Sequence, residues 1–289
     1  KIREKLLGEK HLEVAKIDNK LASVYYKQGK YQQAEKLYQK SLCIHEKILG
    51  KEHRDTATSY NNLAGVYEKQ GKYQQAEELY KKSLCIHEKV LGEEHPDTAT
   101  SYNNLAEVYR IQGKYQQAEK LYQKSLWVYE KILGEEHPDT AISYNNLAMV
   151  YEDQGKYQQA EELCQKSLRI REKVLGREHP DTAISYNNLA GVYQEQGKYQ
   201  QAEELYQKSL WIHEKVLGEE HPDTATSYNN LAEVYRIQGK YQQAEELCQK
   251  SLRIREKVLG EEHPDTATSY NNLAATYSEQ GKYQQAEEL

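Results

Sequence analysis

One unit of 42 residues recurs along the whole chain of 289 residues. Each unit contains a Gly-Lys-Tyr triplet and closes on a Leu-Gly pair, whose glycines are Gly8, Gly50, Gly92, Gly134, Gly176, Gly218 and Gly260. A fixed period of roughly 20 to 50 residues is typical of a solenoid, in which each repeat buries its apolar face only against its neighbours. The period therefore predicts an array of repeats instead of a globular domain around one core.

The seven glycines mark the predicted repeat junctions of a single array over residues 1–289. Residues 9–50 form the most divergent copy, because Leu12 stands where later copies have proline and the pattern Thr-Ser-Tyr-Asn-Asn is missing. We interpret this copy as an N-terminal capping repeat, since terminal repeats are usually atypical. The first residues align with the end of a repeat and the last with its middle, so we expect both ends to be truncated within a repeat.

Each full copy is predicted to form two helices. In the copy that starts at Glu93, the first helix, called A, carries Ala99, Tyr102, Leu105, Ala106 and Tyr109 at helical spacing. Its predicted start has Pro96 at the first helical position and Asp97 beside the positive end of the dipole. The second helix, B, carries Tyr115, Ala118, Leu121, Tyr122, Ser125, Val128 and Ile132. Single glycines, Gly113 and Gly134, are expected to end the two helices, which then pack antiparallel.

Composition excludes several classes of function. The formal net charge is −6, and lysine and arginine alternate with glutamate instead of forming a basic stripe, so we expect no nucleic-acid binding. No signal peptide and no apolar run of membrane-spanning length occur, so we expect no membrane insertion. The four cysteines lie in the B helices without CxxC spacing, which favours reduced thiols in a cytoplasmic protein.

The spacing of large and small residues resembles a known family. Tyr102, Leu105, Ala106, Tyr109, Ala118, Tyr122 and Ser125 resemble the tetratricopeptide signature, whose usual repeat has about 34 residues. The longer unit resembles the variant found in kinesin light chains and in large bacterial and invertebrate repeat proteins. The resemblance implies an all-α, right-handed superhelical solenoid of antiparallel helix-turn-helix repeats, and a protein-binding scaffold without catalysis.

No motif for catalysis, a cofactor or a metal is found. The tripeptide His95-Pro96-Asp97 matches the motif of J-domain co-chaperones, but it occurs five times in connecting loops, which favours a helix start. His45-Glu46 resembles half of a zinc-protease motif and lacks the second histidine. The loop histidines are expected about 10 Å apart, too far to share an ion. We therefore expect no enzyme activity and no cofactor.

The side of helix A opposite its apolar stripe is the predicted binding surface. A helical wheel places Asn103, Glu107, Arg110 and Ile111 together there, with Asn104 at the margin, and in tetratricopeptide arrays this side lines the concave groove. Substitutions among the otherwise near-identical copies gather at these positions, for example Gly65, Glu107, Met149, Gly191 and Glu233 at one of them. Such variation is expected of a surface that selects ligands, and equally of drift on a solvated face.

An asparagine pair on this surface is constant in the six later copies. An amide offers a donor and an acceptor, so a row of amides suits the backbone of an extended peptide, and the resemblance to kinesin light chains implies the same use. The alternative is that each asparagine bonds to the neighbouring repeat. The candidate residues are Asn61, Asn62, Asn103, Asn104, Asn145, Asn146, Asn187, Asn188, Asn229 and Asn230.

Charged residues complete the predicted groove. Arg110 and Arg236 match a groove arginine that the resemblance associates with acidic cargo, and Arg171 and Arg255 match another. Glu107 and Glu152 lie on the same surface, and the central part is acidic, so specificity for acidic cargo is not carried over. Trp127 and Trp211 on helix B are either exposed anchors or part of outer-face packing.

These features predict a scaffold that binds an extended peptide or a partner protein in the concave groove. Two alternatives remain at this stage. The array is a structural spacer that associates head-to-tail through its uncapped ends, or it is the sensor arm of a larger signalling protein.

Overall fold

The computed structural model describes residues 11–289, and every regular element within them is an α-helix. The junction predicted near Gly8 lies outside the described residues. The A helices are α2 (Leu12–Lys27), α4 (Arg54–Lys69), α6 (Pro96–Ile111), α8 (Pro138–Asp153), α10 (Pro180–Glu195), α12 (Pro222–Ile237) and α14 (Pro264–Glu279). The B helices are α3 (Tyr31–Ile48), α5 (Tyr73–Leu91), α7 (Tyr115–Leu133), α9 (Tyr157–Val174), α11 (Tyr199–Leu217), α13 (Tyr241–Leu259) and α15 (Tyr283–Glu287).

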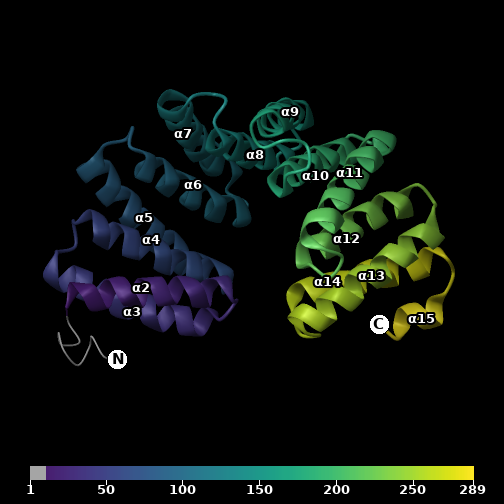
Figure 1. Cartoon of the computed structure of the whole chain (residues 1–289), viewed down its shortest axis with the longest axis horizontal. Helices are drawn as coiled ribbons and strands as arrows, with labels where there is room; N and C mark the ends of the chain where they lie inside the picture. The colour runs from purple at the N-terminus through teal and green to yellow at the C-terminus, as the bar shows by residue number, and fades with distance from the viewer. Residues whose placement is uncertain (1–10) are drawn as a thin grey trace. The chain divides into compact units, whose positions relative to one another are not determined.

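Each A helix packs against the B helix that follows it, as the prediction of helix pairs required (Figure 1). The chain divides into two compact units, residues 1–135 and residues 136–289. The first unit contains α2 to α7 and the second contains α8 to α15. Within each unit, every B helix except the last also packs against the A helix of the next repeat. Within each unit, the described helices therefore pack against helices of their own repeat and of the adjacent repeat, as the 42-residue period predicts.

A histidine caps each full A helix, and proline is the first residue of α6, α8, α10, α12 and α14. His95 is the N-cap of α6, where its Nδ1 accepts the backbone N–H of Asp97 at 3.1 Å, and Pro96 follows at the first position of the helix. The loop histidines of the other later repeats cap their helices in the same way. The helix-start interpretation of the His-Pro-Asp tripeptide is thus confirmed. Gly113 and Gly134 have φ values of 73° and 90°, in the left-handed region that favours glycine.

The predicted apolar stripe of helix A is buried. Ala99, Tyr102, Leu105, Ala106 and Tyr109 are all 8% exposed or less. On helix B, four predicted residues are buried, namely Ala118, Tyr122, Ser125 and Val128. The prediction was wrong for Ile132, which is 45% exposed. The B helix has 19 residues and the A helix 16, so the last turn of B extends beyond its partner helix.

In α4, α6, α10, α12 and α14, a tyrosine bonds to a glutamate of the preceding B helix. Tyr102 donates its hydroxyl hydrogen to Glu88 Oε1 at 2.7 Å, and Tyr228 donates to Glu214 Oε1 at 2.5 Å. The same bond joins Tyr60 to Glu46, Tyr186 to Glu172, and Tyr270 to Glu256. The glutamate lies 14 residues before the tyrosine, so each of these bonds ties one repeat to the next.

Replacing His95 by alanine is expected to lower the free energy of unfolding by about 1 kcal/mol, because the N–H of Asp97 loses its acceptor. His95→Asn should retain most of the stability, since asparagine is a strong N-cap. Urea denaturation followed by circular dichroism measures both variants. Equal losses for alanine and asparagine would show that the cap contributes nothing and that packing of the ring explains the effect.

Candidate functional site

The candidate site is the A-helix face, defined as the side of the A helices that carries the first asparagine of the pair and the residues four and seven positions after it. In α6 these residues are Asn103, Glu107 and Arg110, all partly buried. They lie on one side because successive residues advance by about 100° around a helix. The opposite side of α6 carries Tyr102, Leu105 and Tyr109, which are buried. In α6, the predicted residues therefore lie on one common surface.

Two amide pairs lie on this face. In the first unit, Asn104 donates Nδ2–H to Asn61 Oδ1 at 3.0 Å, and in the second unit Asn230 donates Nδ2–H to Asn187 Oδ1 at 2.8 Å. Each bond joins the second asparagine of one repeat to the first asparagine of the preceding repeat. The bonds leave Nδ2 of Asn61 and Asn187, and Oδ1 of Asn104 and Asn230, without a partner among the described residues. Each pair thus retains a donor and an acceptor.

Two other first asparagines are buried. Asn145 and Asn229 are each 3% exposed. Asn145 donates Nδ2–H to Ser185 Oγ at 3.3 Å, and Asn229 donates to Ser269 Oγ at 2.9 Å. Here the alternative reading applies, in which the amide bonds to the neighbouring repeat. The remaining predicted asparagines, Asn62, Asn103, Asn146 and Asn188, are partly buried.

The predicted groove arginines are paired with glutamates of their own helices. Arg110 donates Nε–H to Glu107 Oε2 at 2.9 Å and Nη2–H to Oε1 at 2.8 Å. Arg236 makes the same two bonds to Glu233 at 3.0 and 2.7 Å, and a third to Glu279 at 3.3 Å. Such two-pronged bonds neutralise the charge of the guanidinium group. An acidic ligand would have to compete with these internal carboxylates.

Buried tyrosines of the B helices donate hydrogen bonds to glutamates of this face. Tyr122 donates to Glu107 Oε2 at 2.7 Å, and Tyr80 donates to Glu68 at 3.1 Å. Burial alone would raise the pKa of Glu107, but hydrogen bonds from Arg110 and Tyr122 outweigh it and hold the pKa below its ordinary value. Burial raises the pKa of Glu68, and Lys69 and the hydrogen bond from Tyr80 only partly offset this effect. Glu152, on the same face in the second unit, is partly buried.

Arg171 and Arg255, which the resemblance suggested as further groove residues, lie inside the array. They are 5% and 6% exposed. Arg171 donates Nη1–H to the carbonyl oxygen of Asp181 at 2.6 Å and to Ser185 Oγ at 3.1 Å. Burial lowers the pKa of both guanidinium groups. Neither side chain can therefore meet a ligand on the A-helix face.

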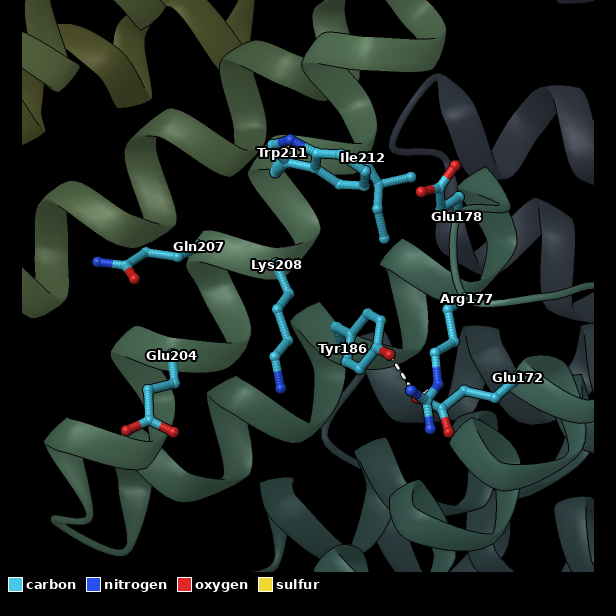
Figure 2. Close-up of a pocket in the computed structure, with 9 residues that line it drawn as sticks. All are labelled: Glu172, Arg177, Glu178, Tyr186, Glu204, Gln207, Lys208, Trp211 and Ile212. Atoms are coloured by element: carbon cyan, nitrogen blue, oxygen red, sulfur yellow. Dashed lines mark hydrogen bonds and ion pairs between the residues drawn. The ribbon is translucent and has the colours of Figure 1, made fainter.

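A second surface feature lies on the B-helix side of the second unit. It is a depression of about 750 Å³. Figure 2 shows the residues that line it, which are Glu172, Arg177, Glu178, Tyr186, Glu204, Gln207, Lys208, Trp211 and Ile212. Trp211 is 49% exposed, and Lys215 Nζ lies 4.5 Å from its ring centroid. Lys215 also pairs with Glu178 at 2.7 Å. Both tryptophans are half-exposed, since Trp127 is 50% exposed, so neither is fully packed.

Within residues 11–289, no group of three or more His, Cys, Asp or Glu side chains is arranged to hold a metal ion. No helix in that range is long and apolar enough to cross a membrane. The cysteines are free; Cys164 and Cys248 are buried, and burial raises their pKa values to about 12 and about 11. Thiols held in the protonated form are poor nucleophiles.

The sequence pattern of the family described as "Tetratricopeptide repeat" matches residues 13–89, 55–131, 97–163, 139–215, 185–246 and 223–289. The chain belongs to the tetratricopeptide repeat family. A search of the curated proteins found no match.

Solved structures define the type of tetratricopeptide array. A candidate kinesin light chain from Podosopora anserina, with nearly identical repeats similar to tetratricopeptide repeats, is 35% identical over 71% of this chain and 98% of that chain, with a TM-score of 0.59. BtubC (BKLC) from P. vanneervenii is 24% identical over 88% of this chain and 92% of that chain, with a TM-score of 0.61. The array is therefore similar to kinesin-light-chain-like proteins with near-identical repeats.

A third similar structure shares the fold alone. It is a signal transduction ATPase with a tetratricopeptide sensor from Pyrococcus horikoshii, 19% identical over 93% of this chain and 41% of that chain, with a TM-score of 0.66.

The contacts behind the A-helix face were not predicted from the sequence. His87 of α5 lies 2.8 Å from Ser101 Oγ, and His213 of α11 lies 2.8 Å from Ser227 Oγ. Arg171 and Arg255 occupy the same position in other repeats of this tetratricopeptide array. A signal existed in the sequence, because this position changes between histidine, tyrosine and arginine while the leucine three residues before it and the glutamate directly after it stay constant.

Proposed function

We propose that the A-helix face binds an extended peptide segment of a partner protein, with the asparagine pairs holding the backbone of the peptide. Tetratricopeptide repeats are generally scaffolds for protein–protein interactions, and this chain has that fold. The observation that carries the finer proposal is the pair Asn61–Asn104, repeated as Asn187–Asn230. The bond within a pair fixes both amides, so little rotamer entropy is left to lose when a ligand binds.

The chemistry of a pair matches that of a peptide backbone. An extended segment presents N–H donors and carbonyl acceptors that no neighbouring strand satisfies. The unpaired Nδ2 of Asn61 can donate to a carbonyl, and the unpaired Oδ1 of Asn104 can accept an N–H. Because both contacts are to the backbone, they hold many different sequences. The variable positions of the face would then select side chains.

The selection is not expected to depend on charge alone. Arg110 and Arg236 are already bound to Glu107 and Glu233. Gly65 and Gly191 lie one turn after the paired asparagines, whereas Glu107 and Glu233 occupy the same position in the repeats that follow. This arrangement favours a ligand whose apolar or small side chains sit against the glycines beside a paired amide.

A peptide-display selection tests the proposal. Peptides should enrich on the parent array and bind at least about tenfold more weakly to a variant in which Asn61, Asn104, Asn187 and Asn230 are alanine, because several hydrogen bonds of about 1 kcal/mol each are lost. Helicity of the variant is checked by circular dichroism, since alanine is a better helix former than asparagine.

The matched control carries Trp127→Ala and Trp211→Ala, which remove exposed side chains of the B helices and leave the A-helix face unchanged. Peptides that enrich on the parent should bind this variant as well as they bind the parent. Loss of binding in the tryptophan variant, with retention in the asparagine variant, would move the site to the B-helix side and refute the proposal. A selection with no enrichment would refute it too.

A further inference from the structure

The residue that follows the core isoleucine or valine differs between the first six B helices. It is His45 in α3, His87 in α5, Tyr129 in α7, Arg171 in α9, His213 in α11 and Arg255 in α13. The histidines and arginines at this position are 4% to 6% exposed. In every repeat with a histidine or an arginine, the side chain contacts a serine of the next A helix, 14 residues later. This contact lies directly behind the A-helix face.

The serine takes a different set of partners beside histidine and beside arginine. Beside His87, Ser101 Oγ lies 2.8 Å from the ring nitrogen and 3.2 Å from the carbonyl oxygen of Asp97 on its own helix. Ser227 is held in the same way by His213 and the carbonyl of Asp223. In both cases the hydroxyl stays on its own helix.

Arginine takes the carbonyl that the serine would otherwise use. Arg171 Nη1 lies 2.6 Å from the carbonyl oxygen of Asp181, and Arg255 Nη1 lies 2.6 Å from that of Asp265. Ser185 Oγ then lies 3.3 Å from Ser167 Oγ, and Ser269 Oγ lies 3.2 Å from Ser251 Oγ.

The serines of α5 and α11 that match Ser167 and Ser251 confirm this difference. Ser83 and Ser209, in repeats with histidine, are buried and have no hydrogen-bond partner among the described residues. Of these four B-helix serines, only the two in repeats with arginine lie within hydrogen-bond distance of the serine hydroxyl of the next A helix.

The bonding partner of the asparagine in the preceding repeat changes together with that of the serine. Beside arginine, Ser185 and Ser269 accept from Asn145 and Asn229, and both asparagines are buried. Beside histidine, Asn61 and Asn187 do not bond to Ser101 or Ser227 and instead form the amide pairs. At the third histidine, His45, the matching Asn19 likewise makes no bond to Ser59.

We propose that the helix B residue at this position determines which repeats present an asparagine to a ligand. Histidine holds the serine on its own helix and leaves the asparagine on the A-helix face. Arginine turns the serine toward the preceding repeat, where it draws the asparagine into the interior. The residue acts through the serine and is a positioning residue without contact to the ligand. The pattern of histidines and arginines would then set where along the array a peptide backbone is held, a consequence that rests on the proposed function.

Exchanging the two residues tests this inference. Arg171→His should release Asn145, and His213→Arg should withdraw Asn187. Both residue types already occur at this position in the array, so both variants are expected to fold. Solvent exchange of the asparagine side-chain amides, measured by nuclear magnetic resonance, is independent of any ligand. The exchange rate of Asn145 should rise about tenfold in Arg171→His, because its amide leaves a buried hydrogen bond, and that of Asn187 should fall by a similar factor in His213→Arg.

Two further variants distinguish the effect of Ser185 from that of the neighbouring residue on the A-helix face. Ser185→Ala removes the acceptor while Arg171 stays in place, so it should also release Asn145. Met149→Gly is the control, because Gly65 and Gly191 lie one turn after the partly buried Asn61 and Asn187, and Met149 lies one turn after the buried Asn145. Release of Asn145 in Met149→Gly, with no change in Arg171→His, would overturn the inference and assign the effect to the residue on the face.

Peptide binding then distinguishes the two proposals. For a peptide selected on the parent array, His213→Arg should weaken binding about three- to tenfold, as expected for the loss of one or two hydrogen bonds. Amide exchange that changes as expected while no peptide binds would leave the positioning role intact and refute the peptide-binding function. Peptide binding with unchanged amide exchange would refute the positioning role alone.

Discussion

Replacing Tyr102 by alanine is expected to lower the free energy of unfolding by about 3–5 kcal/mol, the range for removal of a large aromatic side chain from a core. Tyr102 is 1% exposed, so the change leaves a cavity between α6 and its neighbours. It also removes the bond of 2.7 Å to Glu88 Oε1 on the preceding B helix. Because this bond joins two repeats, the variant should lose cooperativity along the first unit as well as stability. Urea denaturation followed by both circular dichroism and tyrosine fluorescence measures the effect.

Tyr102→Phe is the matched control, since it keeps the ring and removes only the hydroxyl. We expect a loss of about 1 kcal/mol, the usual net contribution of a hydrogen bond. The same pair of variants at Tyr228, which bonds to Glu214 in the second unit, should give similar values. A loss below about 1 kcal/mol for Tyr102→Ala would mean that neighbouring side chains refill the site and that this stripe does not hold the repeats together.

The fold was predictable because the same signals for helix starts, helix ends and apolar spacing recur in successive repeats. Gly113 and Gly134 end the helices, and Pro96 starts one, through local backbone chemistry that needs no knowledge of the tertiary structure. The stripe of Tyr102 and Leu105 follows from helical spacing alone. Ile132 shows the limit of this reasoning. Its spacing matches the stripe, but burial depends on whether a second helix covers that turn, and helix lengths were not predicted accurately enough to decide.

The candidate site was only partly predictable. The helical wheel placed Asn61 and Asn145 at equivalent positions on one face, and the sequence around them is nearly identical. Their side chains nevertheless differ, since Asn61 accepts a bond from Asn104 and Asn145 is buried against Ser185. The cause lies in a residue of another helix, 26 residues later in the chain, where the two repeats carry His87 and Arg171. A wheel describes one helix and cannot contain this information.

The role of the charged residues on the A-helix face was also only partly predictable, because their partners within the protein matter. Arg110 was predicted to line the groove because its position matches an arginine that the resemblance associates with acidic cargo. The structure pairs it with Glu107, three residues earlier in the same helix. That spacing alone allows an ion pair on a helix surface, so the sequence did contain the competing interaction.

The second large effect that we expect is a loss of folding stability at acidic pH. Stability should fall as the pH drops below about 6.5, the ordinary pKa of histidine. His45, His87 and His213 are buried, and burial lowers the pKa of each. Neighbouring charges only partly offset the effect. Asp55 raises the pKa of His45 while His53 and Lys16 lower it, and Asp97 and Asp223 raise the pKa of His87 and His213.

The sign follows from proton binding. Between the folded and the unfolded pKa, the unfolded chain binds a proton that the folded chain does not, so acid favours unfolding. Each histidine changes the free energy of unfolding by at most about 1.4 kcal/mol per pH unit in this window, and three together by about 4 kcal/mol. Urea denaturation at pH 7.5, 6.5, 6 and 5.5 measures the slope, above the range in which ordinary carboxylates are protonated.

His87→Gln is the decisive comparison. Glutamine is uncharged throughout, so the variant should lose about one third of the slope that the parent shows below pH 6.5. Its stability at pH 7.5 can differ from that of the parent, and the test therefore rests on the slope alone. If the variant and the parent have the same slope, His87 does not remain neutral in the folded chain, and its contact with Ser101 holds an imidazolium instead. Protonation would then leave the serine in place, and the presentation of Asn61 should be independent of pH.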